Sequence, residues 1–411
     1  MNGFTTRILH TKDKRKDSNG ALRFPIYECS AFEFETAEEI ASSFDGTQPA
    51  HAYSRVSNPT VEALEQRIVA MSGANDCVAF ASGMAAITTL VFTLCETGSN
   101  IVASRYLFGN TISLFEKTFG PWGLKIKWVN PLNIDEIDLA IDSKTRLVFV
   151  ETISNPQIVV ADVGRISELC KMKSVPFALD NSLVTSYLLR SADFSVSIEI
   201  VSSAKYISGG GTSVGGLIID NNKFDWSLSP KLKPDSDKWG KNTFVKTIRS
   251  NVARNVGACL SPTSAFLQIL GLETLSLRIE RSSQNATKVA EYLNTKSEVF
   301  SVNYPGLPES PYYSLSRNQF RGGYCGGLLS FDLTREISIN SFLNALKLIK
   351  RSSNFNDNKS LIIHPAATLF CEYSEEKLAE MGISRQSIRL SIGIEEVEDI
   401  ISDIDQALGQ C

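Results

Sequence analysis

The sequence predicts an α/β fold in which helices cover a mainly parallel central sheet, followed by a smaller α+β region. Through the middle of the chain, short β-branched runs alternate with longer segments of helical periodicity. Their spacing is typical of strand–helix–strand units with right-handed crossovers, which bind ligands beyond the carboxyl ends of the strands. From about Ser261 the pattern changes to a long helical segment and then apolar strands, which indicates a second region of α+β type.

Seven segments are the expected strands of the central sheet. All are short, largely apolar and rich in β-branched residues, as strands buried on both faces usually are. They are residues 76–80, 100–104, 125–129, 146–151, 176–181, 198–204 and 215–220.

Segments outside this sheet have less regular patterns. The polar N-terminal stretch is expected to be loosely ordered, and the charge-rich residues 225–242 are expected to form a long surface excursion. A single long helix is expected over residues 264–294, with apolar strands in residues 326–333 and 387–393.

The length of the chain indicates more than one domain. A chain of 411 residues exceeds one ordinary compact unit, so two or three domains are expected. We place an N-terminal arm over residues 1–60, a large domain over 61–260 and a C-terminal α+β domain over 261–411.

The composition excludes several classes of function. Apolar residues make up 43% of the chain, and the formal net charge of -4 provides no basic surface for nucleic acid or an anionic membrane. The basic run at residues 12–16 contains an acid and is expected to be solvated. We find neither an N-terminal apolar segment of signal-peptide length nor an apolar run of about 20 residues. A cytoplasmic protein without nucleic-acid or membrane partners is expected.

Cysteine and histidine usage argues against metal and triad chemistry. The eight cysteines are scattered without CxxC pairs, and the histidines are His10, His51 and His364. The thiols are expected to be reduced and mostly in the core. No metal is expected, because a zinc site or a Ser-His-Asp triad has few possible components. The motifs GxGxxG and GxxxxGK are missing as well, which disfavours dinucleotides and nucleoside triphosphates.

Three short elements follow predicted strands, where a doubly wound sheet would bring them to one crevice. In the first, ASGMAAI (81–87), Ser82 and Gly83 open a helix whose backbone N–H groups could bind a phosphate. Taken alone, this element is better explained by a capped helix without a ligand.

The other two elements bring an acid and an amine to nearby strands. The segment PFALDN delivers Asp180 to a strand end, where a carboxylate could keep a pyridine nitrogen protonated. The segment SSAKYISGGG places Lys205 after the next strand, and an amine that forms a Schiff base needs a lowered pKa. A lysine there is by default a surface charge. The surrounding serines and glycines, together with Asp180, favour pyridoxal 5'-phosphate (PLP) bound to Lys205.

Over nearly its whole length the chain resembles the Cys/Met-metabolism family of PLP enzymes. The matching stretches are AYSRVSNPT (52–60), ASGMAA (81–86), FVETISNP (149–156), LDN (179–181), SAKYISGGGTSVGG (203–216), LSPTSAFLQILGLETLSLRIE (260–280), VNYPGLPESPYY (302–313), SLIIHPAAT (360–368) and IRLSIGIEEVEDI (388–400). Together they form a highly specific signal. The resemblance implies the aspartate aminotransferase-like fold, fold type I, and is greatest to the O-acetylhomoserine sulfhydrylase (homocysteine synthase) branch.

The resemblance also implies roles for single residues in the cofactor site. Lys205 would hold PLP, Asp180 would pair with the pyridinium and Asn155 would contact the phenolic oxygen of the ring. Phe108 would stack on the ring as a catalytic residue. The phosphate would be bound by Ser82, Gly83, Met84 and Ser202.

Two further pairs of residues are implied at the edges of this site. Tyr53 and Arg55 would reach the phosphate of the neighbouring subunit, so activity would need an oligomer, expected to be a homotetramer built as a dimer of dimers. Arg389, at a strand start, would bind the substrate carboxylate through a bidentate fork, with Asn354 beside it. Surface ion pairing is the default for an arginine, but not inside these motifs.

The implied reaction is a PLP-dependent γ-replacement on an O-acylated homoserine. O-acetylhomoserine and sulfide, or a protein-bound sulfur donor, would give homocysteine and acetate in methionine biosynthesis. Cystathionine γ-synthesis and methionine γ-elimination use the same cofactor residues and stay open. A catalytically silent paralogue would have no physical need for Lys205, Asp180, Asn155 and Arg389.

Three positions depart from the family pattern. Phe108 stands where most members have a tyrosine, so it could stack on the ring but has no hydroxyl for proton transfer. Ala204 replaces the usual threonine before the lysine, and Gly210 replaces the histidine of GGHG. These departures leave open a thiocarboxylated carrier protein as sulfur donor, or another nucleophile.

Overall fold

In the part of the chain that the structure describes, the central sheet has the seven strands that the sequence predicts. The computed structural model describes residues 3–12 and 17–411, so most of the basic run at 12–16 lies outside the described residues. The strands are β1 (Asp76–Phe80), β2 (Asn100–Ser104), β3 (Lys125–Val129), β4 (Thr145–Glu151), β5 (Phe177–Asp180), β6 (Ile198–Val201) and β7 (Gly216–Asp220). Their order is β1-β7-β6-β5-β4-β2-β3. In this described sheet β7 runs antiparallel to both of its neighbours, and the other six strands all run in the same direction. The mainly parallel α/β fold is confirmed.

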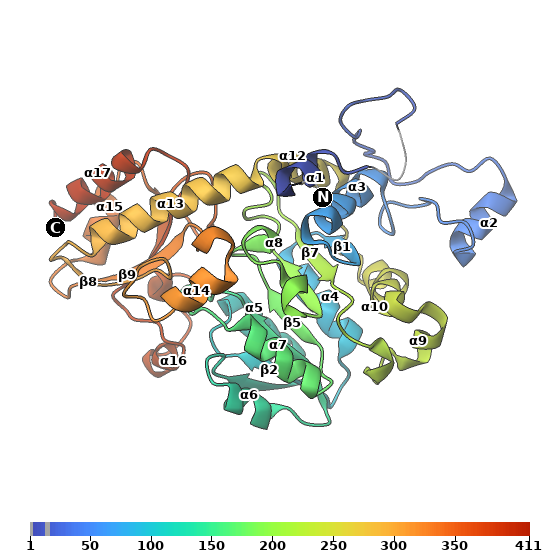
Figure 1. Cartoon of the computed structure of the whole chain (residues 1–411), viewed down its shortest axis with the longest axis horizontal. Helices are drawn as coiled ribbons and strands as arrows, with labels where there is room; N and C mark the ends of the chain where they lie inside the picture. Colours follow the sequence, from blue (N-terminus) through green and yellow to red (C-terminus); the bar gives the residue numbers. More distant parts are fainter. Residues whose placement is uncertain (1–2, 13–16) are drawn as a thin grey trace.

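Both faces of the central sheet are buried under helices (Figure 1). Along β4, Val148 and Val150 belong to one core cluster, whereas Leu147 and Phe149 belong to the other, as the two-residue period of a strand requires. The helices in this part are α3 (Pro59–Ser72), α4 (Gly83–Leu94), α5 (Gly109–Ser113), α6 (Ile134–Ala140), α7 (Val163–Met172) and α8 (Thr185–Leu188), with a π-helical segment at Leu114–Phe119. Apolar residues of α3 and α7 cover the first face, and those of α4 cover the second.

A second sheet lies in the C-terminal region, which is orange to red in Figure 1. Its strands are β8 (Val299–Asn303), β9 (Leu328–Leu333), β10 (Lys350–Arg351), β11 (Leu361–Ile363) and β12 (Ser387–Ser391), in the order β10-β11-β12-β9-β8. The helices of this region are α12 (Pro262–Glu273), α13 (Leu275–Leu293), α14 (Tyr313–Gln319), α15 (Ile339–Ala345), α16 (Glu375–Glu380) and α17 (Val397–Leu408). The expected α+β arrangement is therefore present.

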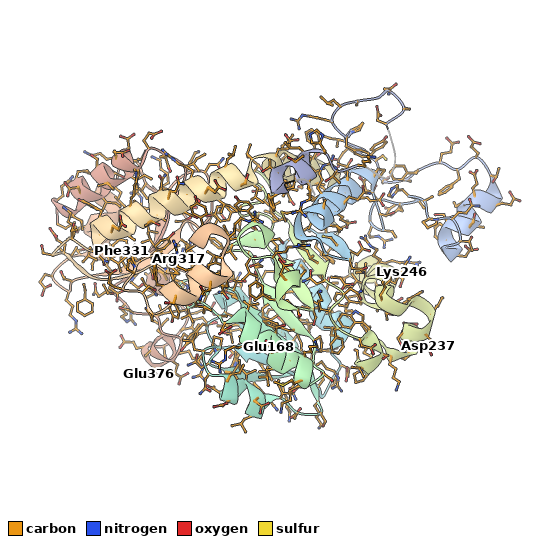
Figure 2. The ribbon with its side chains drawn as sticks, viewed as in Figure 1. Glu168, Asp237, Lys246, Arg317, Phe331 and Glu376 are labelled. Atoms are coloured by element: carbon orange, nitrogen blue, oxygen red, sulfur yellow. The ribbon has the colours of Figure 1, made fainter. Side chains whose placement is uncertain are left out.

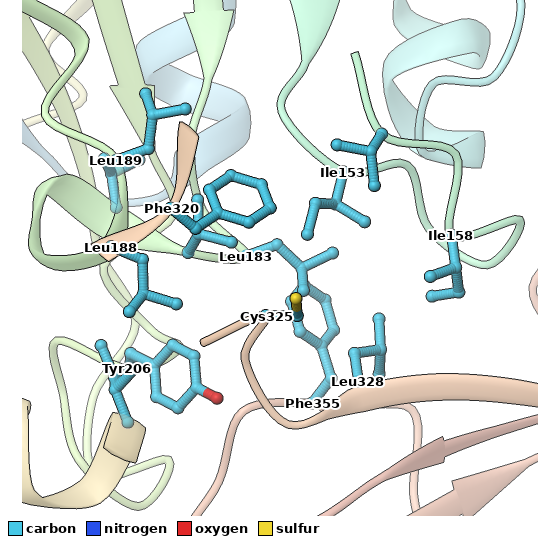
Figure 3. Close-up of a cluster of buried hydrophobic side chains, with 14 of the residues drawn as sticks. Ile153, Ile158, Leu183, Leu188, Leu189, Tyr206, Phe320, Cys325, Leu328 and Phe355 are labelled. Atoms are coloured by element: carbon cyan, nitrogen blue, oxygen red, sulfur yellow. The ribbon is translucent and has the colours of Figure 1, made fainter. Parts of the chain in front are cut away.

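Buried side chains join the two regions in one core. Figure 3 shows Leu183 and Tyr206, which follow strands of the central sheet, in the same cluster as Phe355 of the C-terminal region. The backbone N–H of Gly327 donates a 2.8 Å hydrogen bond to the hydroxyl of Tyr206. Because Tyr206 directly follows Lys205, this bond fixes the lysine turn to the C-terminal region.

The prediction of a single helix over residues 264–294 is wrong. The structure has α12 and α13 instead, separated at Thr274, whose φ of -112° and ψ of 9° are not helical. Gly271 lets α12 pack on the turn after Lys205, since an added Cβ there would lie 2.1 Å from the carbonyl oxygen of Ile207. This contact belongs to the tertiary structure, whereas the apolar periodicity continues through Thr274.

The surface excursion expected over residues 225–242 is partly helical. It contains a 3-10 turn (Trp226–Leu228) and α9 (Lys233–Trp239), and α10 (Thr243–Thr247) follows, with a π-helical segment (Ile248–Ala253) and α11 (Arg254–Val256) after it. Trp226 and Leu232 are buried and hold the segment against the body of the chain. Asp237 of this segment is exposed, and so is Lys246 in the following helix α10 (Figure 2), whereas Lys231 donates hydrogen bonds to the carbonyl oxygens of Phe92 and Cys95.

The N-terminal stretch is more ordered than expected. In α1 (Phe4–Leu9), Phe4 and Ile8 are buried, and the rings of Phe4 and Tyr187 lie 4.6 Å apart. The next helix, α2 (Ala37–Asp45), buries none of its residues and projects from the rest of the chain (Figure 1). Phe44 is 70% exposed there, so this chain alone leaves an apolar side of α2 uncovered.

Half of the thiols lie outside the core. Cys77, Cys95, Cys170 and Cys325 are buried, but Cys29, Cys259, Cys371 and Cys411 are exposed, and all eight are free. The expectation of mostly buried thiols is wrong, because the exposed cysteines lie in loops and at the chain end, where apolar sequence neighbours do not ensure burial.

Within residues 3–12 and 17–411, no helix combines the length and the apolar composition needed to cross a membrane.

Candidate active site

A cavity of about 560 Å³ lies where the carboxyl ends of the central strands face the C-terminal region. Nine residues to which the resemblance assigns a role line it: Ser82, Gly83, Met84, Phe108, Asn155, Asp180, Ser202, Lys205 and Asn354. A doubly wound sheet is expected to bind its ligand in this place. The three short elements that follow strands therefore do meet at one site.

The turn between β1 and α4 forms one end of the cavity. The side chain of Ser82 caps α4, since its Oγ accepts a 3.0 Å hydrogen bond from the N–H of Ala85. Gly83 lies against Ser202, and an added Cβ would be 2.9 Å from the Cβ of Ser202. The helix start and Ser202 thus form a compact cradle with backbone N–H groups, which is suitable for a phosphate. The capping explanation therefore holds for Ser82, and its part in binding a phosphate stays a prediction.

Asp180 ends β5 in the floor of the cavity. Its Oδ1 accepts a 3.0 Å hydrogen bond from the N–H of Ser182, and burial raises the pKa of the carboxyl group. Among the described residues, no lysine, arginine or histidine forms an ion pair with it. A buried carboxylate without a cation is costly, so a protonated ring nitrogen would fit beside Asp180.

Lys205 follows β6 and approaches the C-terminal wall of the cavity. Its Nζ donates a 2.6 Å hydrogen bond to Oδ1 of Asn354 and lies 4.3 Å from the ring centroid of Phe355. Burial, and after it the positive charge of Arg389, lowers the pKa of Lys205 to about 8. Because β5 and β6 are adjacent, the expected placement of Asp180 and Lys205 on neighbouring strands is confirmed. An amine with this lowered pKa is suited to bond covalently with an aldehyde.

Arg389 lies behind the cavity wall and is 1% exposed. It stands in the middle of β12, not at a strand start as expected. Its Nη1 donates to Oδ1 of Asn155 at 3.1 Å, and its Nη2 donates to the carbonyl oxygens of Ser353 and Asn354 at 2.8 and 3.0 Å. The buried Nε has no hydrogen-bond partner in the described chain, and burial lowers the pKa of Arg389 to about 10. This is a buried cation that lacks an anion, rather than a surface ion pair.

Two residues of the implied site lie apart from this cavity. Tyr53 is 45% exposed, and the guanidinium of Arg55 lies 5.4 Å from its ring centroid. Arg55 also donates a 2.6 Å hydrogen bond to the carbonyl oxygen of Arg254. Neither residue lines the cavity of its own chain.

The departures from the family pattern have visible effects. Phe108 and Ala204 line the cavity and present no hydroxyl to it. Gly210 has a φ of 135°, and an added Cβ would lie 3.0 Å from Nδ2 of Asn358. A histidine at this position would therefore adopt a strained backbone conformation and would displace the amide end of the Asn358 side chain.

For two residues that line the cavity, the sequence analysis predicted no role. Glu151 ends β4 directly beside Asp180 in the register of the sheet. The sequence did contain a pattern that could have indicated Glu151, because this residue is an acid at the carboxyl end of an apolar strand, as Asp180 is. Phe355 faces both Lys205 and Arg389, with the Arg389 guanidinium 5.4 Å from its ring centroid. No sequence pattern indicates this, because the three residues are far apart in the chain.

A doubly wound sheet that brings a buried amine of lowered pKa beside an acid without a cation is the arrangement of a PLP enzyme of fold type I. The sequence profile of the family described as Cys/Met metabolism PLP-dependent enzyme matches residues 5–409. The chain belongs to this family, and PLP is its cofactor.

Named relatives resemble this chain over almost its whole length. An O-acetyl-L-homoserine sulfhydrylase of Corynebacterium glutamicum is 35% identical, over 98% of this chain and 96% of that protein. An L-methionine gamma-lyase of Pseudomonas putida is 33% identical, over 99% of this chain and 97% of its own.

Solved structures give the same result. The O-acetylhomoserine sulfhydrylase of the methionine biosynthetic pathway of Wolinella succinogenes is 40% identical with a TM-score of 0.80, over 99% of this chain and 100% of that one. A chain from Campylobacter jejuni is 33% identical with a TM-score of 0.93, over 99% of this chain and 100% of that one. It contains a pyridoxyl-lysine phosphate.

Proposed function

We propose that the chain replaces the acetyl group of O-acetylhomoserine by sulfur, giving homocysteine and acetate for methionine biosynthesis. The observation that carries the proposal is the pairing of a buried amine of lowered pKa, Lys205, with a buried arginine that lacks an anion, Arg389. The amine suits proton transfer at the substrate, and the arginine suits its carboxylate. The likeness to named sulfhydrylases supports the choice of substrate.

When bound, PLP supplies an electron sink for charge that develops at the substrate carbons. Asp180 would keep the ring nitrogen protonated, and Asn155 would contact the phenolic oxygen. The phosphate would be held by Ser82, Gly83, Met84 and Ser202, and the ring would be stacked by Phe108.

Lys205 is the proton carrier in this proposal. It would remove a proton from Cα and another from Cβ of the substrate, after which acetate leaves from Cγ. Sulfide then bonds to Cγ, and protons return to Cβ and Cα. Because Phe108 and Ala204 have no hydroxyl, they cannot share this task. Arg389, with Asn354 beside it, would hold the carboxylate in place through these steps.

The assembly around this site is also part of the proposal. Tyr53 and Arg55 lie outside their own cavity, and the uncovered helix α2 precedes them, which supports a role in a neighbouring subunit. A dimer of dimers in the cytoplasm is proposed, with residues 1–60 as the arm, 61–260 as the large domain and 261–411 as the C-terminal domain. The sulfur donor is sulfide or a sulfur-carrier protein.

The visible spectrum of the purified holoenzyme tests the proposal. O-acetylhomoserine should shift the cofactor band, and added sulfide should restore it while homocysteine forms. A band that ignores O-acetylhomoserine would overturn the substrate assignment.

Turnover with different nucleophiles separates the alternatives. Cystathionine formation from cysteine would favour cystathionine γ-synthesis. Release of 2-oxobutanoate and ammonia from methionine without any nucleophile would favour γ-elimination, the reaction class in the name of the Pseudomonas putida relative.

A further inference from the structure

Glu151 is a buried acid in the cavity to which the proposed reaction gives no task. It is the last residue of β4, lies opposite Asp180 in the register with β5, and is 9% exposed. Among the described residues, no cation forms an ion pair with it. Burial, followed by the negative charge of Asp180, raises the pKa of Glu151. A second acid beside Asp180 is unfavourable for folding, so a specific contact is needed to explain it.

The first contact of Glu151 is with Phe108, which lines the cavity and is proposed to stack on the PLP ring. Its Oε1 accepts a 2.6 Å hydrogen bond from the backbone N–H of Phe108. Phe108 is the N-cap of α5, and its side chain makes no capping hydrogen bond. The distant carboxyl group therefore does for this helix what the acid of a capping box does locally.

The second contact of Glu151 is with Asn155, which follows β4 and also lines the cavity. Its carboxyl group also interacts with the backbone N–H of Asn155, and Oδ1 of Asn155 accepts the hydrogen bond from Arg389. One carboxyl group thus contacts the backbones of Phe108 and Asn155. Since Phe108 has no hydroxyl to anchor its ring, the backbone contact helps to set where that ring lies.

We infer that Glu151 is a positioning residue, which fixes the Phe108 ring and the Asn155 amide in the PLP site through their backbone N–H groups. It touches neither substrate nor reacting atoms in this role. The inference rests on the PLP site of the proposed function but not on the identity of the substrate.

Paired variants test the role of Glu151. Glu151→Gln keeps an acceptor oxygen at the same place, whereas Glu151→Ala removes it. Glu199 offers a matched control, because it is fully buried on β6 and accepts hydrogen bonds from Asn181, Ser186 and Ser191 without lining the cavity. The readouts are the visible circular dichroism of bound PLP, the rate of PLP release and the melting temperature, all without substrate.

Glu151→Ala is expected to halve the dichroism band roughly and to release PLP about tenfold faster, since a buried hydrogen bond to the site is lost. Glu151→Gln should stay within about threefold of the parent in release rate. Glu199→Ala should lower the melting temperature and leave the dichroism unchanged. If Glu151→Ala fails to fold, Glu151→Asp replaces it, because the shorter side chain cannot reach both N–H groups.

Two outcomes overturn the inference. In one, Glu151→Ala lowers only the melting temperature, as Glu199→Ala does, so the role is structural. In the other, Glu151→Gln releases PLP as fast as Glu151→Ala does. The negative charge of Glu151, and not its hydrogen-bond acceptor oxygen, would then be what the site needs. Loss of the sulfhydrylase assignment alone would leave these spectra, and the inference, unaffected.

Discussion

The two walls of the cavity hold ionisable groups of opposite kinds, acids on one wall and a guanidinium behind the other, without ion-pair partners in the described chain. The strand wall, formed by the ends of β4 and β5, contains Glu151 and Asp180, which form no ion pair in the described chain. The C-terminal wall is backed by Arg389, which faces no carboxylate and keeps a free buried Nε. Lys205 starts from the strand wall and reaches Asn354 of the other. Each wall lacks its counter-charge, and a ligand with a cationic ring nitrogen and an anionic carboxylate would supply both.

The largest effect is expected from the amine between the walls. Lys205→Ala should lose the covalent cofactor band and reduce kcat about 1,000-fold or more, because proton transfer to and from the substrate is lost. Absorption spectra and activity assays measure this. Far-UV circular dichroism should stay unchanged. A variant with an unaltered band and activity would contradict the assignment of Lys205.

The strand wall is tested by neutralising its acid. Asp180→Asn cannot keep the ring nitrogen protonated, so kcat should fall on the order of 100-fold. The cofactor-free variant should melt no lower than the parent, because a costly buried carboxylate is removed. Asp220→Asn, at a buried strand end outside the cavity, is the control and should leave kcat unchanged. Activity of Asp180→Asn within threefold of the parent would refute the role.

The C-terminal wall is tested by keeping its charge and changing its shape. Arg389→Lys retains a cation but loses the planar fork, so KM for O-acetylhomoserine should rise about 10-fold or more while kcat changes less. Steady-state kinetics separate the two constants. Arg146→Lys, at a largely buried arginine that pairs with Glu96 outside the cavity, is the control and should leave KM unchanged. An equal fall in kcat with KM constant would assign Arg389 to another step.

The smallest effect is expected on the pKa of Lys205, which the positive charge of Arg389 behind the other wall lowers. Only the neutral amine of Lys205 is a nucleophile, so PLP capture by cofactor-free protein should accelerate as pH rises and level off above about 8. Arg389→Gln removes a positive neighbour and should move this midpoint upward, yet not to the value of a free lysine, since burial is the larger cause. Rapid-mixing absorbance measures the midpoint. An unshifted midpoint in Arg389→Gln would deny the coupling.

The central sheet was predictable because of its burial on both faces. Strands of this kind are apolar runs bounded by turns, so all seven agree with the structure to within three residues. The expected helix over 264–294 failed because Thr274 is neither glycine nor proline and interrupts no periodicity. The helix α9 was missed because its stability depends on Trp226 and Leu232 packing elsewhere in the fold.

The site was predictable where chemistry follows a strand in sequence. Asp180, Lys205 and the Ser82–Met84 turn come directly after strands of one sheet, and topology brings such positions together. The placement of Arg389 within β12 and the ring of Phe355 between two cations depend on packing between regions. Glu151 shared the pattern of Asp180 but carried no further mark of its backbone contacts.

The contact between Gly271 and the turn after Lys205 limits which residues can replace this glycine. The helix α12 touches this turn with only a hydrogen atom in place of a side chain, since a Cβ would meet the Ile207 carbonyl oxygen at 2.1 Å. Even an alanine would have to displace either the helix or the turn that carries the amine. The turn that carries the lysine thereby excludes any side chain at Gly271, a position that lines no part of the cavity.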